Sequence, residues 1–525
     1  MKTSQPPAAT SASVGRTVLA LPARWSTVLN AALWAAPLAV FWACYHEAIN
    51  AWWMADDSAI LLSVIRFGAL AHWIRPNVDI EIAASNLTPW LYTSYAIDFA
   101  IAGLEPRAAY IHHLLVWFAT LVVLTLLLRP WLGASVTAVV IVWFILAVPT
   151  GSIVQLLCTR HYLEGLLLAL LSILAYSAYR LGGRARYLWI SAALYAWAMT
   201  AKEIYVPLGP MLVLHHALYD PSSDAPLGTW SAALRAFGRR LVGSCVVLWP
   251  FFALIAAYVV WRGYMLGFDR LLAGYDDPAS RATPALALTL PTLWKESFRW
   301  ARWQTGLWML VFVSALIGWV VFRAPLPRSR AVLFGSAVAA ATLLPVYPVL
   351  GFVRVNIHYL FLPGLAFFVL AGWTIRQIDQ GSGETVRAGR SPVASALMKY
   401  GRFAVVMIVV FLVFAQYRTE QRGSWLWSER EYVEQYRVEG QYELYSNDRS
   451  LVLDAVGPPW HHRALQWIRR IWLHSQEGPL ACAGEQCKAM VAQIDGQAGV
   501  CKRYASVSRQ LETVSCTSQS RTAGK

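Results

Sequence analysis

The chain has 525 residues, of which 57% are hydrophobic and only 14% are charged. Its formal charge of +15 comes from 44 Lys and Arg against 29 Asp and Glu, and it carries no nucleic-acid-binding motif. This composition excludes an ordinary soluble domain and predicts an integral membrane protein whose basic loops face anionic lipids rather than nucleic acid.

Long apolar blocks predict an all-α polytopic fold. A helix needs about 20 mainly apolar residues to cross the hydrocarbon core, and the chain offers about eleven such blocks. In chain order, the expected spans cover residues 27–47, 108–128, 131–149, 161–179, 187–201, 204–219, 241–262, 304–322, 331–350, 358–375 and 402–417.

The short loops carry Lys and Arg mainly on one side, which sets the expected orientation because basic loops tend to stay in the cytoplasm. Residues 1–24 are then a cytoplasmic segment, residues 25–417 a transmembrane domain, and residues 48–107 its first outward loop. An odd number of spans places the tail, residues 418–525, outside. We therefore expect a multi-pass protein of the bacterial inner membrane, with a periplasmic C-terminal domain.

Four cysteines cluster in that tail, at Cys482, Cys487, Cys501 and Cys516. An oxidising compartment favours disulfides, for which three pairings are open, and a metal site is the alternative. The stretch WHHRALQWIRRIWLHS has apolar residues at helical spacing, which predicts an amphipathic helix packed on a small core.

The first outward loop mixes acidic residues with tryptophans, and Asp56 and Asp57 follow directly after the first span. Long non-spanning loops in compact proteins are usually functional. The simpler interpretation of the pair is two solvated loop acids or a helix N-cap before Ser58. Further along, PWLYTSYAIDFAIAGL is apolar but short for a span, and we expect an amphipathic helix on the outer surface.

Lys202 and Glu203 lie at the junction of two short apolar blocks, without a loop long enough to solvate them freely. Ionisable groups at such a depth are costly, and by default they indicate a functional site. The alternative is a mutual ion pair that only ties two helices together.

Three motifs carry a family resemblance: the Asp56-Asp57 pair, the stretch NLTPWLYTSYAIDFAIAGLEPRAAYIHHLL, and TAKEIYVPLGP further on. In this order they resemble the polytopic GT-C glycosyltransferases, and most of all the branch of protein O-mannosyltransferases and their tetratricopeptide-linked relatives. The resemblance covers most of residues 25–375 and leaves out the tail, where no helix-pair repeats are evident.

The resemblance implies transfer of a sugar from a polyprenyl-phosphate carrier to an acceptor on the outer side, with inversion at the anomeric carbon. A first-loop carboxylate acts as the general base, because an acceptor hydroxyl is a poor nucleophile until its proton is removed. Adjacent residues point in different directions on a helix or strand, so Asp56 and Asp57 are not expected to share one task. We favour Asp56 as the base, with Asp57 as its structural or acceptor-binding neighbour.

The donor phosphate needs cations, since negative charge grows on it as the glycosidic bond breaks. The resemblance assigns Lys202 to the phosphate, with Glu203 orienting it, and adds the outward site in GFVRVNIHYLFLP. That site holds Tyr359, but His358 replaces the family's arginine, and Arg354 one helical turn earlier can supply the fixed charge. Two further outward candidates, each also interpretable as a snorkelling anchor, are Arg160 and Arg262.

The expected partners are thus the lipid-linked donor, a glycan, lipid or protein acceptor, and membrane lipids. No cofactor is required, whereas a divalent metal is compatible with the family, and no metal site is assigned. Two alternatives stay open. One is a transporter or flippase of lipid-linked sugars without chemistry, in which polar residues would gather near the bilayer midplane. The other is a scaffold whose site has decayed.

Overall fold

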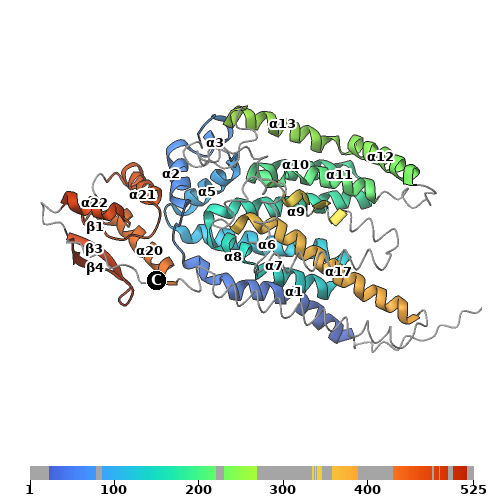
Figure 1. Ribbon diagram of the computed structural model, residues 1–525, viewed down its shortest axis with the longest axis horizontal. Coiled ribbons are helices and arrows are strands. Elements are labelled where there is room, and N and C mark those ends of the chain that lie inside the picture. The colour runs from blue at the N-terminus through green and yellow to red at the C-terminus, as the bar shows by residue number, and fades with distance from the viewer. Residues whose placement is uncertain are drawn as a thin grey trace, which may run out of the picture.

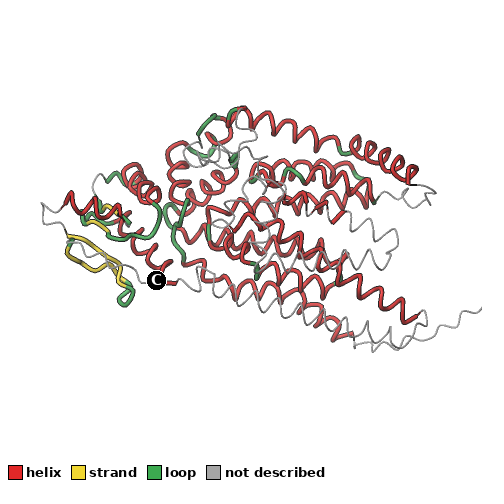
Figure 2. The backbone as a smooth tube through the Cα atoms, in the orientation of Figure 1, coloured by secondary structure: helices red, strands yellow, loops and turns green. Residues whose placement is uncertain are grey.

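The computed structural model describes residues 23–78, 86–219, 230–268, 357–387, 430–475, 478–483, 485–494 and 500–516, with a few more residues between 334 and 345. Within these ranges the protein is mostly helical. Figure 1 shows a bundle of long helices along the longest axis, a group of shorter helices at one end of it, and the tail beyond that group. Strands occur in the tail (Figure 2).

The bundle and the first loop consist of α-helices joined by 3₁₀ helices (η). In chain order these are α1 (Ala23–Tyr45), η1 (His46–Asn50), α2 (Asp57–Phe67), α3 (Ala71–Ile74), α5 (Pro89–Ala102), α6 (Pro106–Leu132), α7 (Ala134–Ile145), α8 (Val148–Gln155), η2 (Leu157–Thr159), α9 (Arg160–Gly182), α10 (Ala185–Ala201), η3 (Glu203–Tyr205), α11 (Leu208–Leu218), α12 (Trp230–Val247), α13 (Trp249–Leu266), η9 (Ile357–Leu360) and α17 (Phe361–Arg387).

Among the described residues, three helical segments are long and apolar enough to cross a membrane: Pro106–Leu132, Leu157–Gly182 and Trp249–Leu266. A fourth arises if the bent pair Ala134–Ile145 and Pro149–Gln155 is one span. Together with the composition, these segments identify a membrane protein.

Among the described residues, the expected span at 204–219 is divided between η3 and α11, which has only 11 residues. Two further expected spans are also divided, each near a proline. The block at 131–149 is divided between α7 and α8, whose axes differ by 62° across the segment before Pro149. The block at 241–262 is divided between α12 and α13, with Pro250 in the first turn of α13. Proline lacks an N–H group and disfavours helix at the preceding residue, so it ends the earlier segment. The expected spans at 304–322 and 402–417 lie outside the described residues.

The first outward loop folds as α2, α3 and α5, which gather at one end of the bundle (Figure 1). The helix predicted after Pro89 is confirmed: α5 begins at that proline and ends before Gly103, whose φ of 62° is left-handed. Its buried side chains are polar as well as apolar, the apolar ones including Leu91 and Tyr92. Ser94 and Asp98 are buried, whereas Ile101 is 75% exposed.

The described tail contains three helices and a small sheet in the strand order β2-β1-β3-β4. Strand β1 pairs in parallel with β2 and β3, and β3 pairs antiparallel with β4. Of the three open cysteine pairings, the structure has Cys482–Cys487 and Cys501–Cys516. The elements are α20 (Arg430–Tyr445), β1 (Leu451–Val452), α21 (Pro459–Trp472), β2 (Leu480–Ala481), α22 (Glu485–Ile494), β3 (Val500–Ala505) and β4 (Gln510–Ser515).

One hydrophobic cluster joins the first loop to the tail. From the loop side it includes Trp52, Trp53, Ile60, Leu61 and Tyr95, and from α20 and α21 it includes Val433, Tyr436, Leu444, Leu465 and Ile468. Gly440 of α20 permits this approach, since a Cβ there would lie 2.3 Å from Nε1 of Trp52. The predicted tail helix, now α21, therefore packs directly against the loop that carries the acidic pair.

Candidate active site

Asp57 is a buried anchor at the first turn of α2. Its Oδ2 accepts a hydrogen bond from the Met54 N–H at 2.7 Å, and its Oδ1 accepts one from the Tyr95 hydroxyl at 2.7 Å. Burial raises the pKa of Asp57 to about 7, against the lowering effect of the Met54 N–H, the Tyr95 hydroxyl and the Cys158 N–H. The carboxyl group thus ties α2 to its preceding turn, to α5 and to η2.

Asp56, its neighbour, is exposed and lies at the N-cap position of α2. Its side chain makes no capping hydrogen bond to that helix; instead, Oδ1 accepts a hydrogen bond of 3.0 Å from the indole N–H of Trp460 in α21. Crowding by neighbouring atoms desolvates the carboxylate and raises the pKa of Asp56, and the Trp460 hydrogen bond lowers it in part. Of the two acids, Asp56 is the one whose side chain is open to solvent.

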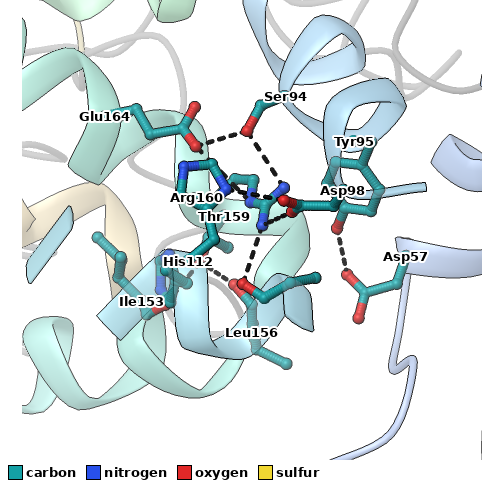
Figure 3. A network of polar contacts seen from close by, with 12 residues as sticks. Asp57, Ser94, Tyr95, Asp98, His112, Ile153, Leu156, Thr159, Arg160 and Glu164 are labelled. Carbon is teal, nitrogen blue, oxygen red and sulfur yellow. Dashed lines mark hydrogen bonds and ion pairs between the residues drawn. The ribbon is translucent and has the colours of Figure 1, made fainter. Parts of the chain in front are cut away.

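A buried ion network lies behind the acidic pair (Figure 3). The Arg160 guanidinium donates to the Asp98 carboxylate, to the Ser94 hydroxyl at 3.2 Å and to the Ala109 carbonyl at 3.1 Å. Its Nε lies 3.8 Å from Glu164, one helical turn along α9. Arg160 has no exposed surface. Its charge is therefore matched by acids within the protein.

His112 completes this network, with Nδ1 2.9 Å from Oδ1 of Asp98. Although burial opposes it, the His112 hydrogen bond and the Arg160 charge hold the pKa of Asp98 below its usual value. The network joins α5, α6 and α9, the three helices around Asp57. Tyr95 is its link to the acidic pair, because it lies one residue after Ser94 on α5 and donates to Asp57 (Figure 3).

Lys202 forms a second cluster, where α10 ends and the backbone becomes extended (φ −157°, ψ 138°). It is buried, and its Nζ lies 5.2 Å from the centroid of the Tyr162 ring. The Tyr162 ring also contacts His358, at 5.2 Å, and Tyr359, at 6.3 Å between centroids. The structure thus brings together three of the predicted phosphate-site residues around an aromatic hub.

A close packing contact holds this cluster in place. The Tyr205 hydroxyl of η3 donates to the Tyr162 carbonyl, and the Tyr205 ring lies over Gly165 of α9. A Cβ at Gly165 would come within 2.2 Å of that ring, so only glycine allows η3 to approach α9 this closely. Because Lys202 directly precedes η3, the close packing of η3 on α9 also places Lys202 next to Tyr162.

Glu203 points to different partners. It forms an ion pair with Arg262 of α13 and accepts a hydrogen bond of 2.9 Å from the backbone N–H of Leu87. The structure therefore pairs two of the predicted donor-site residues with each other and ties α13 to the start of α5. Arg354, the remaining predicted cation, lies outside the described residues.

The two clusters are joined by one short segment. The Cys158 N–H of η2 interacts with Asp57, and Tyr162 in the first turn of α9 holds the Lys202 cluster. Cys158 and Tyr162 are four positions apart in sequence. The continuous segment of η2 and the start of α9 therefore contacts both the acidic pair and the lysine cluster.

In the part of the chain that the structure describes, no three His, Cys, Asp or Glu side chains are grouped to hold a metal ion.

Sequence reasoning did not identify Asp98, Tyr162, Glu164 or Trp460 as members of these clusters. Asp98 interrupts an apolar helix, and Glu164 follows Arg160 at i+4, so both gave local signals of a buried pair. Trp460 gave none, since its contact with Asp56 joins residues 404 positions apart.

No family model matches the sequence, and no curated protein sequence matches it. Among solved structures, the chain is similar to ArnT from Cupriavidus metallidurans bound to undecaprenyl phosphate, at 14% identity and a TM-score of 0.43, covering 93% of this chain and 94% of that chain. It is also similar to the archaeal oligosaccharyltransferase AglB from Archaeoglobus fulgidus in complex with an inhibitory peptide and a dolichol-phosphate, at 10% identity and a TM-score of 0.45, covering 87% of this chain and 65% of that chain.

Proposed function

We propose that this protein is an inverting glycosyltransferase that uses a polyprenyl-phosphate-linked sugar as donor. The observation that carries the proposal is the combination of an exposed carboxylate, Asp56, whose neighbour Asp57 interacts with η2, and a buried lysine–aromatic cluster at the start of α9, which follows η2 directly. Acid–base chemistry and phosphate binding are the two requirements of this reaction, and each cluster supplies one of them.

In the proposed reaction, Asp56 takes the proton of the acceptor hydroxyl, and the acceptor oxygen attacks the anomeric carbon of the donor. The bond from that carbon to the phosphate oxygen breaks, and its electron pair leaves with the polyprenyl phosphate. Attack from the face opposite the phosphate inverts the anomeric centre. Lys202 stabilises the charge that grows on the phosphate, which a fixed cation in a water-poor site does more effectively than solvent.

The aromatic side chains around Lys202 suit a lipid-linked donor. The Tyr162 ring lies 5.2 Å from the Lys202 ammonium group, and His358 and Tyr359 contact that ring. This aromatic surface would exclude water from the phosphate and offer a path for a prenyl chain. The donor would enter laterally from the membrane, and the acceptor would approach Asp56 from the periplasmic side. The proposal requires no cofactor, and a divalent ion bound with the donor would be compatible with it.

One observation favours the transporter alternative. The helix breaks between α10 and α11, at Lys202, and discontinuous helices at a polar site are typical of transporters. A transporter would move the lipid-linked sugar intact, whereas a transferase releases free polyprenyl phosphate.

The test is sugar transfer by the purified protein in lipid vesicles, offered a panel of polyprenyl-phosphate sugars and acceptors. Release of polyprenyl phosphate by the wild type, lost in Asp56→Asn and retained in Glu105→Gln, supports the transferase. Glu105 is a matched control, because it is an exposed acid of the same loop whose side chain caps no helix. Translocation of the intact donor without phosphate release would overturn the proposal in favour of transport.

A further inference from the structure

The tail is fixed to the first loop at the acidic pair. The Ser58 hydroxyl, one residue after Asp57, lies 2.9 Å from Nδ1 of His461 and donates to the His461 carbonyl at 3.3 Å. Both residues are buried. Burial, followed by the charge of His462, lowers the pKa of His461 to about 3, so α21 makes this contact through a neutral imidazole.

A second contact holds α21 within the tail itself. Nδ1 of His462 lies 2.7 Å from Oε1 of Glu443 on α20, and both side chains are buried. Together with the shared hydrophobic cluster, this contact fixes the direction in which α21 presents its first turn to α2. Trp460 belongs to that turn.

We propose that Trp460 is a positioning residue for Asp56, so that the C-terminal tail completes the active site instead of only covering it. This inference rests on the proposed function, in which Asp56 is the base. The Trp460 indole N–H binds Oδ1 of Asp56 at 3.0 Å and restricts rotation of the carboxylate. A carboxylate has two oxygens with about four lone-pair sites, so the group can still take a proton from an acceptor.

The chemistry of the hydrogen-bond donor, the indole N–H of Trp460, explains why a tryptophan suits this position. An indole N–H is a neutral donor without acceptor capacity, so it orients the carboxylate without the strong pKa depression that an adjacent arginine would cause. Arginine does neutralise carboxylates in this protein, at Asp98 and Glu203, where the acids serve as structural anchors. The Trp460 hydrogen bond therefore orients the Asp56 carboxylate and leaves it able to accept a proton.

Titratable groups near Asp56 come from α2, η2 and α21. These are Asp57, Cys158 and His461, the last of which contacts Ala55 and Ser58 on either side of the acidic pair. Replacing Trp460 by phenylalanine changes none of these groups. It removes the N–H donor and keeps an aromatic ring at the same exposed position.

The experiment compares wild type, Trp460→Phe and Trp467→Phe, in full-length protein in lipid, by two readouts across pH. Trp467 is a matched control, since it is an equally exposed tryptophan two turns further along α21. The first readout is infrared titration of the carboxylic-acid band that disappears in Asp56→Asn. The second is the pH profile of kcat and of donor KM.

In Trp460→Phe we expect the infrared midpoint of Asp56 to move to higher pH, because the lost hydrogen bond favoured the ionised form. We expect kcat below that midpoint to fall about 2- to 10-fold with donor KM unchanged. Trp467→Phe should match the wild type in both readouts.

An infrared midpoint in Trp460→Phe equal to that of the wild type would overturn the inference, even if transfer is observed. Wild-type protein that transfers no sugar would refute the proposed function instead, and the infrared titration would still decide whether Trp460 controls Asp56.

Discussion

Two neighbouring regions of this protein use acidic side chains in opposite ways. Around Arg160, three helices enclose an ion network in which Asp98 and Glu164 face the guanidinium, out of solvent. At the start of α2, Asp56 is exposed and receives a neutral hydrogen bond from another part of the chain. The network ties three helices together, and the exposed acid beside it is the base of the proposed reaction.

Asp57 lies between these two regions, and its buried, hydrogen-bonded carboxyl group resembles the acids around Arg160. It resembles Asp56 in sequence, but its bonds to Met54 and Tyr95 make it part of the scaffold. This comparison indicates that the hydrogen-bond and ion-pair partners of an acid distinguish a structural role from the proposed catalytic role. The residue type and its place in a motif do not. The predictions below test this separation, from the largest expected effect to the smallest.

The largest effect is expected for Arg160→Met. Removal of the guanidinium leaves Asp98 and Glu164 buried without their cation, which typically costs about 3–5 kcal/mol of stability. Thermal unfolding in detergent should show a large drop in Tm. Arg470→Met, at an exposed arginine of α21, is the control and should unfold like the wild type. An unchanged Tm in Arg160→Met would show that the network does not hold the scaffold.

Lys202→Met tests the second cluster. Loss of a hydrogen-bonding charge at a bound phosphate should cost about 1.5–3 kcal/mol, or about 10- to 100-fold in donor affinity. Donor KM and direct binding of polyprenyl phosphate measure it. His215→Ala, in the last turn of α11, serves as a control that should bind normally. Wild-type donor affinity in Lys202→Met would remove the lysine from the donor site.

Asp57→Asn should affect stability more than chemistry. An amide has one oxygen to accept hydrogen bonds from Met54 and Tyr95, so one buried donor is left facing an NH₂ group, at a cost of about 1–3 kcal/mol. Thermal unfolding at pH 7 measures the loss. An activity loss larger than this destabilisation explains would argue that Asp57 takes part in the reaction.

The smallest effect, counted per pH unit, is the pH dependence of stability. The pKa of Asp57 is about 7 in the folded protein and 3.8 by default, so the folded state binds the extra proton between these values. The contribution of Asp57 to stability is therefore fully present below about pH 4 and is lost as pH rises towards 7, by at most about 1.4 kcal/mol per pH unit. Thermal unfolding of Asp57→Asn across the same range should show a flatter dependence, and an identical slope would contradict the assignment.

Local features of the fold could be predicted from the sequence. Pro89 and Gly103 mark the ends of α5, and Lys202-Glu203 marks the break between α10 and α11, because these signals act over a few residues. Contacts between distant residues could not be predicted. The sequence predicts a phosphate ligand or lipid anchor at Arg160, because its partner Asp98 lies 62 residues away in sequence. The contact of Trp460 with Asp56 could not be predicted for the same reason, because only the packing of α21 on α2 brings the two residues together.

The most direct test of the account is turnover by Asp56→Asn and Asp57→Asn, compared at matched folded concentration and with saturating donor. If Asp56 is the base, its variant should bind donor normally and lose about 10²- to 10⁴-fold in kcat, the usual contribution of general-base catalysis. Asp57→Asn, once corrected for its unfolded fraction, should retain most of its activity. The opposite result, an active Asp56→Asn and a folded but inactive Asp57→Asn, would contradict the division of roles between the two acids.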